Sequence, residues 1–347
     1  MMSANRQALD AAKAAQVVVQ DQFCVKPGET VLVTADTRSD HCAVQAVLAA
    51  AAACSAKPLL LTMPQLPYQG TLADPFIPDA LGSAAASADA WFDMSFPYIA
   101  GSAVHDRAMQ AGRVRYLLLG DADAGTLARL YGAIGLDQLF EVQSRFDEWM
   151  ASRSGASCTV RAANGTEFSF TLGKPAAAKK RHADTPGMST VPGSCIFYPE
   201  PDSVRGTIVL DAIFHEHYAL LREPIRLLVD GEIRKVHHAR EHALLTERAL
   251  RRAGRGSYGR VIHLTCGFHP AAWFRGRSFI EDIRTLGTNA IGLGVPWWEP
   301  GGGENHPDGV LLRQSLWLDG EPIVKDGLIV GPRELCEAAR VLQQEFA

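Results

Sequence analysis

Cysteine is scarce and scattered in this sequence. Seven Cys stand among 347 residues, at positions 24, 42, 54, 158, 195, 266 and 336, and no two of them form a Cys-x-x-Cys pair. The odd number and the wide spacing exclude a small domain stapled by disulfides. They favour reduced thiols, so we expect a cytoplasmic protein.

An excess of charge of one sign is also absent. The chain carries 34 Lys and Arg against 38 Asp and Glu, a formal net charge of -4. Without a basic surplus, nucleic acid is not an expected partner. A hydrophobic content of 47% with 21% charged residues excludes a disordered chain, and the length fits two domains.

Long hydrophobic runs are missing too. The longest weakly apolar stretch, residues 47–57, is rich in Ala and shorter than the ~20 residues that a membrane-spanning helix needs. The N-terminal sequence MMSANRQALDAAKAAQ reads as a polar amphipathic helix with no apolar signal core. We therefore expect a soluble protein with no membrane partner.

The first 150 residues alternate between strand and helix patterns. Apolar runs predict strands at 27–36, 58–64, 88–95 and 114–120, and helical patterns fall at 41–56, 105–112, 123–133 and 137–152. This order predicts a parallel, doubly wound α/β domain over residues 1–152. The segment contains neither G-x-G-x-x-G nor G-x-x-x-x-G-K-[ST], so a nucleotide-binding role has no support.

From about residue 157 the pattern changes to hairpins. Asn164-Gly165 predicts a type I′ turn between two alternating runs, and Asp-Gly pairs follow at 230–231, 319–320 and 326–327. The other elements expected here are helices at 238–253, at 277–287 and from Pro332, and a strand at 260–268. We expect residues 153–347 to form an α+β domain that carries the functional site. The whole chain is then an α/β protein of two domains.

Two histidine pairs could bind a metal, but each has a simpler interpretation. His238, Glu241 and His242 match the H-x-x-E-H pattern of inverted zincins, in a segment that otherwise reads as a charged surface helix. His215 and His217 face one side if they lie on a strand, although a histidine pair at the rim of a sheet explains them equally well. Both pairs remain alternatives.

A third set of metal-binding residues combines two segments. His306-Pro-Asp308 follows the aromatic and Gly-rich stretch 294–303, which is typical of a site-lining loop. His263 lies in an apolar strand pattern, where a lone His is more often a core residue. Together, His263, His306 and Asp308 would supply the two His and one carboxylate that hold mononuclear non-haem Fe(II).

Four segments carry a resemblance to a known family. They are PGSCIFYPEPDSVRGTIVLD (192–211), IHLTCGFHPAAW (262–273), NAIGLG (289–294) and HPDGVL (306–311). In this order they resemble the 2,5-dihydroxypyridine 5,6-dioxygenase family, which is related to the thermophilic metallo-aminopeptidases (leucyl aminopeptidase T-like).

The resemblance implies one iron ion held by His263, His306 and Asp308. The aminopeptidase branch has a Glu where this chain has Ser194 and another near the position of His263, so a two-metal site would lack those carboxylates. The resemblance therefore favours one Fe(II) over two zinc ions.

The implied activity is ring cleavage of a hydroxylated pyridine or a related aromatic compound by O₂. Trp297 and Trp298 would wall the substrate cavity. The alternative is a metallohydrolase, an aminopeptidase or an aromatic aminohydrolase, with Zn, Mn or Co and with Glu304 as the base. In either case we expect a homo-oligomer.

The sequence departs from the family's pattern in the acid–base residues. The Glu and His that the dioxygenases carry around the segment 176–192 have no convincing match here. The basic run of Lys179, Arg181 and His182 stands in their place, either to bind an anionic group of the substrate or as an exposed basic loop. We expect His269 to take over proton transfer.

Overall fold

A computed structural model of the chain describes residues 2–175, 181–237, 242–296, 298–299, 302 and 306–344. It divides into two compact units: unit 1, Met1–Leu136 with Lys179–Val191, and unit 2, Asp137–Ala178 with Pro192–Ala347. The predicted division at residue 152 differs from these units in two places. The helix α6 (Leu136–Ser152) falls almost wholly in unit 2, and a later segment returns to unit 1.

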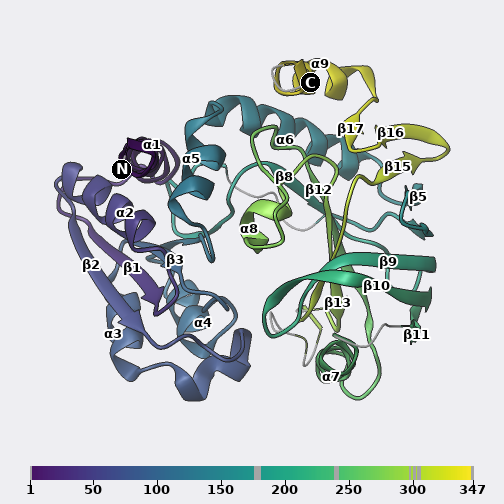
Figure 1. The fold of residues 1–347 in the computed structure, drawn as a ribbon, viewed down its shortest axis with the longest axis horizontal. Helices are drawn as coiled ribbons and strands as arrows, with labels where there is room; N and C mark the ends of the chain where they lie inside the picture. The colour runs from purple at the N-terminus through teal and green to yellow at the C-terminus, as the bar shows by residue number, and fades with distance from the viewer. Residues whose placement is uncertain are drawn as a thin grey trace. The chain divides into compact units, whose positions relative to one another are not determined.

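Unit 1 is built on a parallel sheet of five strands (Figure 1). β1 pairs in parallel with both β2 and β3, which confirms the predicted parallel α/β arrangement. The short strand β7 comes from the returning segment and pairs in parallel with β4. In spatial order the strands are β2 (Lys57–Met63), β1 (Thr30–Asp36), β3 (Ala90–Met94), β4 (Arg115–Leu118) and β7 (Gly187–Ser189).

Helices connect these strands. α2 begins after Asp40, whose carboxylate accepts a hydrogen bond from the Ala43 N–H at 2.8 Å, and its buried face is mostly Ala, which permits close packing. The sequence did not predict η2 or α3. The helical segments are α1 (Met2–Gln16), the π-helix η1 (Val17–Gln22), α2 (His41–Ala53), the 3-10 helix η2 (Gly70–Phe76), α3 (Asp79–Ser87), α4 (Ala103–Gln110) and α5 (Ala124–Gly132).

Unit 2 contains a 12-stranded sheet whose pairings are antiparallel (Figure 1). The α+β expectation is therefore confirmed. Along the main path the strands are β17 (Leu328–Ile329), β16 (Glu321–Lys325), β15 (Ser315–Leu318), β5 (Ser157–Ala162), β6 (Thr166–Thr171), β9 (Arg205–Phe214), β14 (Asp308–Leu311), β13 (Asn289–Gly294), β12 (Arg260–Gly267) and β8 (Ser194–Phe197). β10 (Tyr218–Asp230) pairs with β9 and with β11 (Glu232–His237).

The helices of unit 2 follow the sequence pattern with one exception. α7 (Ala243–Ala253) and α9 (Arg333–Gln344) form where helices were predicted. The helix expected over 277–287 is reduced to α8 (Phe279–Asp282). It is short because the chain after Asp282 bonds to the end of β12: the Arg284 carbonyl accepts from the backbone N–H of His269, and the Thr288 carbonyl accepts from that of Gly267. The chain after α8 then bridges His269 at Thr285.

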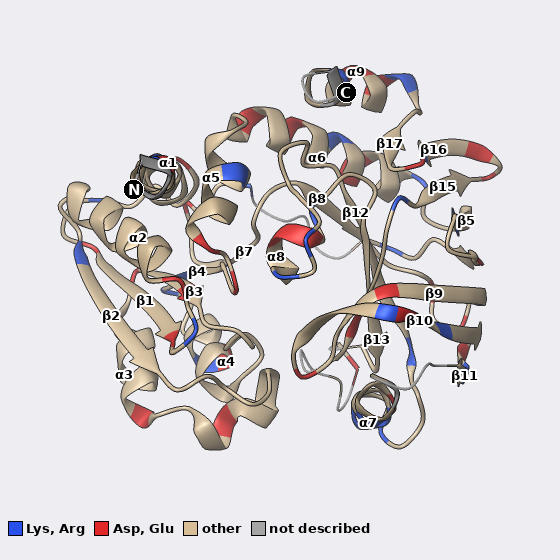
Figure 2. Ribbon diagram, in the orientation of Figure 1, with Lys and Arg blue, Asp and Glu red and all other residues tan. Residues whose placement is uncertain are grey.

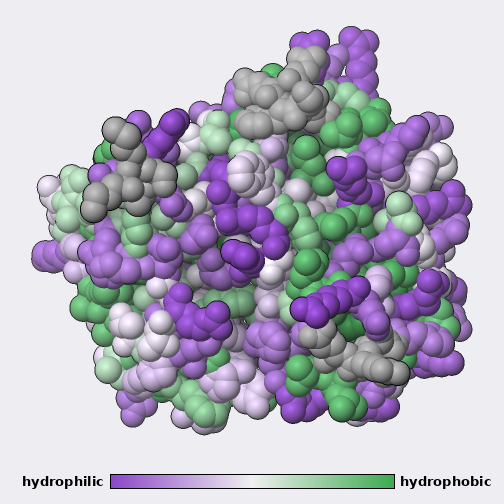
Figure 3. Space-filling view, in the orientation of Figure 1, coloured by the Kyte–Doolittle hydropathy of each residue, from purple (hydrophilic) through white to green (hydrophobic). Residues whose placement is uncertain are grey.

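Charge and hydropathy are mixed over the chain. Figure 2 shows acidic and basic residues interspersed along the elements of each unit, as the near-neutral composition leads one to expect. The face in Figure 3 carries hydrophilic and hydrophobic side chains next to one another. None of the helices in the described ranges combines the length and the apolar character of a membrane span.

Candidate metal centre

His263, His306 and Asp308 converge on one point in unit 2. His263 Nε2 lies 3.3 Å from His306 Nε2 and 3.2 Å from Asp308 Oδ1, and His306 Nε2 lies 3.8 Å from Asp308 Oδ1. All three side chains are buried, with residue exposures of 7%, 4% and 3%. The predicted convergence of the three residues is therefore present, from positions 43 residues apart in the chain.

Neighbouring strands bring these side chains together. Across β12, β13, β14 and β9 the register sets His263 opposite Gly292, Gly292 opposite Asp308, and Asp308 opposite Phe214. Residues in one such row point to the same face of a sheet. A Cβ on Gly292 would lie 2.3 Å from the His263 ring, so only glycine leaves room for the ring to reach over β13 towards Asp308.

His306 reaches the site from the segment just before β14. Pro307 keeps the preceding residue extended, which places His306 and Asp308 on the same side of the chain. The Pro307 carbonyl accepts a hydrogen bond from the Leu293 N–H at 2.9 Å, and this bond fixes the segment to β13. His306 and Asp308 thus lie on one side of an extended segment, as the H-x-D pattern predicts.

The electrostatics of the group suit a cation. Burial raises the pKa of the Asp308 carboxyl, but His306 and His263 outweigh it and hold this pKa below its usual value. Asp308 is therefore an anion at neutral pH. Its buried Oδ1 accepts no well-aligned hydrogen bond from the described residues, although His263 Nε2 is only 3.2 Å away. Such close, unaligned ligand atoms fit a shared metal ion.

The ligand types agree with that fit, and so do the spacings of 3.3 and 3.2 Å from His263, while the 3.8 Å between His306 and Asp308 would have to shorten on binding. Ligands at about 2.0–2.2 Å from a first-row metal ion lie roughly 3.0–3.5 Å apart. Two imidazoles and a carboxylate suit Fe, Zn, Mn or Co, so the donor set alone does not select one of them.

Aromatic side chains border this row. β8 ends at Phe197, which pairs with Leu264, the residue after His263, and Tyr198 directly follows β8. Trp298 packs edge-to-face on Tyr198, with ring centroids 5.5 Å apart, and remains 52% exposed. An aromatic wall formed by Trp298 thus stays a prediction that this contact supports. Trp297 and Glu304 lie outside the described residues.

His269 is held in the core of unit 2, beyond the end of β12. It is fully buried, and its ring Nδ1 accepts a hydrogen bond from the Ala271 N–H at 3.2 Å. Its backbone N–H donates to the Arg284 carbonyl at 2.9 Å. A Cβ on Gly193 would lie 2.6 Å from the His269 side chain, so the ring packs directly on backbone. A role for His269 in proton transfer stays a prediction.

Arg181 and His182 belong to unit 1. His182 is exposed, with its Nδ1 2.9 Å from the Asp21 carbonyl oxygen, and the following Ala183 N–H donates to the Gln22 carbonyl at 2.7 Å. The basic run is therefore attached to η1. Lys179 lies outside the described residues, and substrate binding by this run stays a prediction.

The sequence alone missed two features of the site, Gly292 and Tyr198. A glycine inside the apolar strand NAIGLG is a signal, because glycine in a strand interior often marks a close approach by a neighbouring group. Tyr198 follows the segment PGSCIF, and only the register of β8 on β12 places it at the site.

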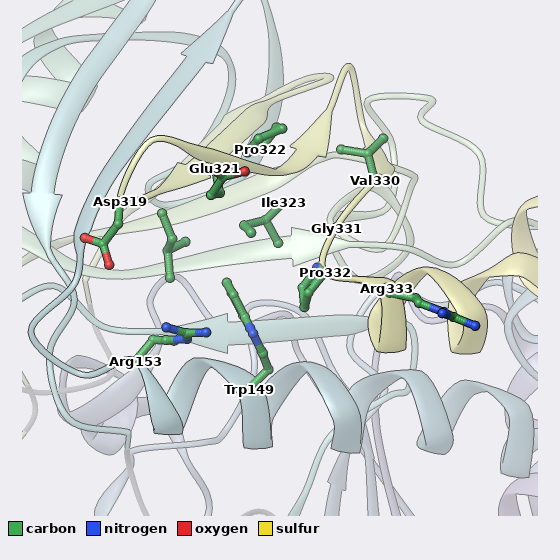
Figure 4. Close-up of a pocket in the computed structure, with 11 residues that line it drawn as sticks. Trp149, Arg153, Asp319, Glu321, Pro322, Ile323, Val330, Gly331, Pro332 and Arg333 are labelled. Atoms are coloured by element: carbon green, nitrogen blue, oxygen red, sulfur yellow. The ribbon is translucent and has the colours of Figure 1, made fainter.

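A separate pocket of unit 2 uses none of the predicted site residues. It has a volume of about 370 Å³ and lies between α6, the β15–β16 hairpin and the start of α9 (Figure 4). Trp149, Arg153 and Asp319 are among its lining residues.

Comparisons with known proteins identify the fold. In the structure of the 2,5-dihydroxypyridine dioxygenase from Pseudomonas putida KT2440, 98% of the chain aligns with 94% of this one, at a TM-score of 0.73 and 22% identity. In wild-type AmpT from Thermus thermophilus the corresponding shares are 99% and 93%, at a TM-score of 0.64 and 12% identity. No curated protein matches the sequence.

The family comparison covers nearly the whole chain. The sequence profile of the 2,5-dihydroxypyridine 5,6-dioxygenase family matches residues 15–331, a range that covers most of both units and includes His263, His306 and Asp308. The resemblance seen in the four sequence segments is confirmed, and the chain belongs to the 2,5-dihydroxypyridine 5,6-dioxygenase family.

Proposed function

We propose that this protein is an Fe(II)-dependent ring-cleaving dioxygenase that acts on a hydroxylated pyridine or a related aromatic compound. Family membership supports a dioxygenase. The observation that carries the proposal of a metal centre is the buried group of His263, His306 and Asp308, and family membership favours iron. Two His and one carboxylate on one face of an octahedron leave three positions open, which suits the binding of two reactants.

The three residues would hold the ion and set its charge. Asp308, ionised in a buried position, would offset one of the two positive charges of Fe(II), and the two neutral imidazoles would complete the protein face. When bound, Fe(II) supplies the redox chemistry by which O₂ reacts with an aromatic ring.

The protein's other contribution is to position the ring and exclude water. Tyr198 is buried directly after β8, and Trp298 packs on it with an exposed aromatic surface. A flat aromatic substrate would pack against such a surface. Ring cleavage by both atoms of O₂ balances without a further reductant, so no second cofactor is needed.

The test is O₂ uptake after anaerobic loading with Fe(II), measured over a panel of dihydroxypyridines and hydroxylated aromatic acids. Wild type should consume O₂ with at least one of these substrates, and His306→Ala and Asp308→Ala should not. Asp184→Ala, at an exposed carboxylate of unit 1, is the matched control and should behave as wild type.

The metallohydrolase alternative gives the opposite result. A protein that consumes no O₂ with any substrate, yet hydrolyses peptides or aromatic amines when loaded with Zn, Mn or Co, would refute the dioxygenase proposal.

A further inference from the structure

Three more histidines gather where β9 turns into β10. His215 and His217 lie in the turn, and His242 lies directly before α7. One ring nitrogen of each lies within 4.8 Å of those of the other two, and His215 Nε2 is 3.3 Å from His242 Nδ1. We call these three residues the turn cluster. It joins members of the two histidine pairs that the sequence left as separate alternatives.

The turn cluster is built by the fold rather than by chance proximity of mobile side chains. Phe214 pairs with Tyr218, so the turn has only three residues, and both histidines flank Glu216. The Glu216 carboxylate binds two arginines of α7, Arg248 and Arg252, the latter at 3.1 Å. These ion pairs dock the turn on α7 and so bring it to His242.

We propose that the turn cluster is a second metal site, for a first-row divalent ion of the zinc class. Three imidazoles are a ligand set that Zn²⁺, Co²⁺, Ni²⁺ and Cu²⁺ accept. Its ligands are disjoint from His263, His306 and Asp308, so each site can be removed by substitution without replacing a ligand of the other.

The spacing of one ligand pair is that of a tetrahedral ion, and the other two pairs lie within 4.8 Å. Nitrogen ligands at about 2.0–2.1 Å from zinc lie roughly 3.4 Å apart, close to the 3.3 Å between His215 and His242. His215 is buried, His242 is half-buried and His217 is exposed, so the fourth position faces solvent and a water molecule can fill it.

The protonation state of the group agrees as well. Burial, helped by the neighbouring His217 and His242, lowers the pKa of His215 to about 3, and burial lowers the pKa of His217. Both imidazoles are therefore neutral at pH 7 and have lone pairs for a metal.

Loading the site changes one hydrogen bond. His215 Nδ1 accepts from the Glu216 N–H at 2.6 Å, so Nε2 carries the ring proton and donates it towards His242. On loading, the ion takes the place of the Nε2 proton, that proton moves to Nδ1, and the bond from Glu216 opens. One hydrogen bond is small against three metal–nitrogen bonds.

The experiment counts metal ions on the untagged, full-length chain. Wild type and variants are dialysed against Zn²⁺ and analysed for bound zinc, and Co²⁺ absorption spectra report the ligand geometry. Wild type should bind two ions, His306→Ala one, and the double variant His306→Ala/His217→Gln none. His217 is exposed, so its substitution should leave the fold intact, which circular dichroism checks.

The decisive comparison is made in the His306→Ala background. Adding His217→Gln should weaken zinc binding by about a hundredfold or more, since even loss of an outer-shell partner costs 10–100-fold. Adding His41→Gln, at an exposed histidine of unit 1, should change nothing. If His306→Ala binds no zinc, or if His217→Gln binds it as tightly as the His41→Gln control, the second site does not exist. Neither result depends on dioxygenase activity.

Discussion

At the scale of single residues, the candidate metal centre depends on a glycine, Gly292, which has no side chain to block the His263 ring. The His263 ring occupies the space that a Cβ on Gly292 would need, 2.3 Å away. The three candidate ligands could be proposed from the sequence, because the H-x-D pattern and a histidine in an apolar strand are visible there and the family resemblance joins them. The glycine between them could not, since its role exists only once β12, β13 and β14 are in register.

Gly292→Ala should therefore disrupt the metal centre without touching a ligand. The added methyl group would push the His263 ring away from His306 and Asp308. We expect Fe(II) affinity to fall by at least about tenfold and stability by roughly 1–3 kcal/mol, as for an overpacked core. Metal titration and chemical denaturation measure the two effects.

Gly82→Ala is the matched control, because a Cβ there meets only ordinary contacts at 3.7 and 3.8 Å. It should leave Fe(II) affinity unchanged and should not lower stability, because Ala is favoured over Gly inside the helix α3. Wild-type Fe(II) affinity in Gly292→Ala would contradict the geometry described for His263.

Two buried thiols should make the protein sensitive to alkali. Burial raises the pKa of Cys158 and of Cys266 from 9.0 to about 12. Below pH 9 both folded and unfolded chains keep these protons. Above it the unfolded chain loses them first, so the free energy of unfolding should fall, by roughly 1 kcal/mol per thiol between pH 9 and pH 10.

Denaturant melts of wild type and Cys266→Ala at both pH values measure this effect. The variant should show a shallower fall. Val261→Ala, which also opens space in β12 but removes no thiol, should keep the wild-type slope. Equal slopes in wild type and Cys266→Ala would mean that the thiol does not titrate as described.

At the scale of elements, the Asn-Gly and Asp-Gly pairs were the most informative part of the sequence. They predicted where hairpins form, and the errors concern only the type of turn. Hairpins form at all four predicted Asn-Gly and Asp-Gly pairs. Asp319 and Asp326 have positive φ, as does the glycine after each, which fits the type I′ turn. Asn164-Gly165 and Asp230-Gly231 do not fit it, because only the glycine of each pair has a positive φ.

The prediction of a type I′ turn at Asn164-Gly165 is wrong because the side chain of Asn164 is engaged elsewhere. Its Nδ2 donates to the Val209 carbonyl at 2.9 Å and its Oδ1 accepts from the Thr166 N–H at 3.0 Å. Only Gly165 has a positive φ, and Ala162 pairs with Thr166, so the loop has three residues. These partners lie on β6 and β9 and cannot be read from the turn itself.

The Asp-Gly turns at 319–320 and 326–327 should respond differently to a Gly→Ala substitution. Gly320 and Gly327 both have positive φ, but a Cβ on Gly320 meets nothing within 4 Å, whereas one on Gly327 lies 3.0 Å from the Leu286 carbonyl oxygen. Gly320→Ala should cost about 1 kcal/mol, the price of the backbone conformation alone. Gly327→Ala should cost more, and chemical denaturation of both variants compares them. Equal costs would contradict the close approach at Gly327.

At the scale of the whole molecule, the fold class could be predicted and the division into units could not. Strand–helix alternation followed by hairpins predicted a parallel sheet and then an α+β region, and both are present. β7, however, lies in the second region of the sequence but pairs with β4 in the sheet of unit 1. β7 has only three residues, too few for a recognisable strand pattern. The sequence therefore could not show that it pairs with a strand some seventy residues earlier.

For the whole chain, the family and the fold are shown, and the metal and the substrate are proposals. Membership of the dioxygenase family rests on nearly the whole chain, and the two solved structures share its fold at 22% and 12% identity. The ligand set accepts several metals.

The most direct test of the proposed chemistry is mass spectrometry of the product formed under ¹⁸O₂ by the Fe(II)-loaded protein, with a substrate identified by O₂ uptake. Ring cleavage at the centre of His263, His306 and Asp308 predicts a product that contains both labelled oxygen atoms, and no labelled product from Asp308→Ala. A product with oxygen from water alone would contradict the account and favour a hydrolase.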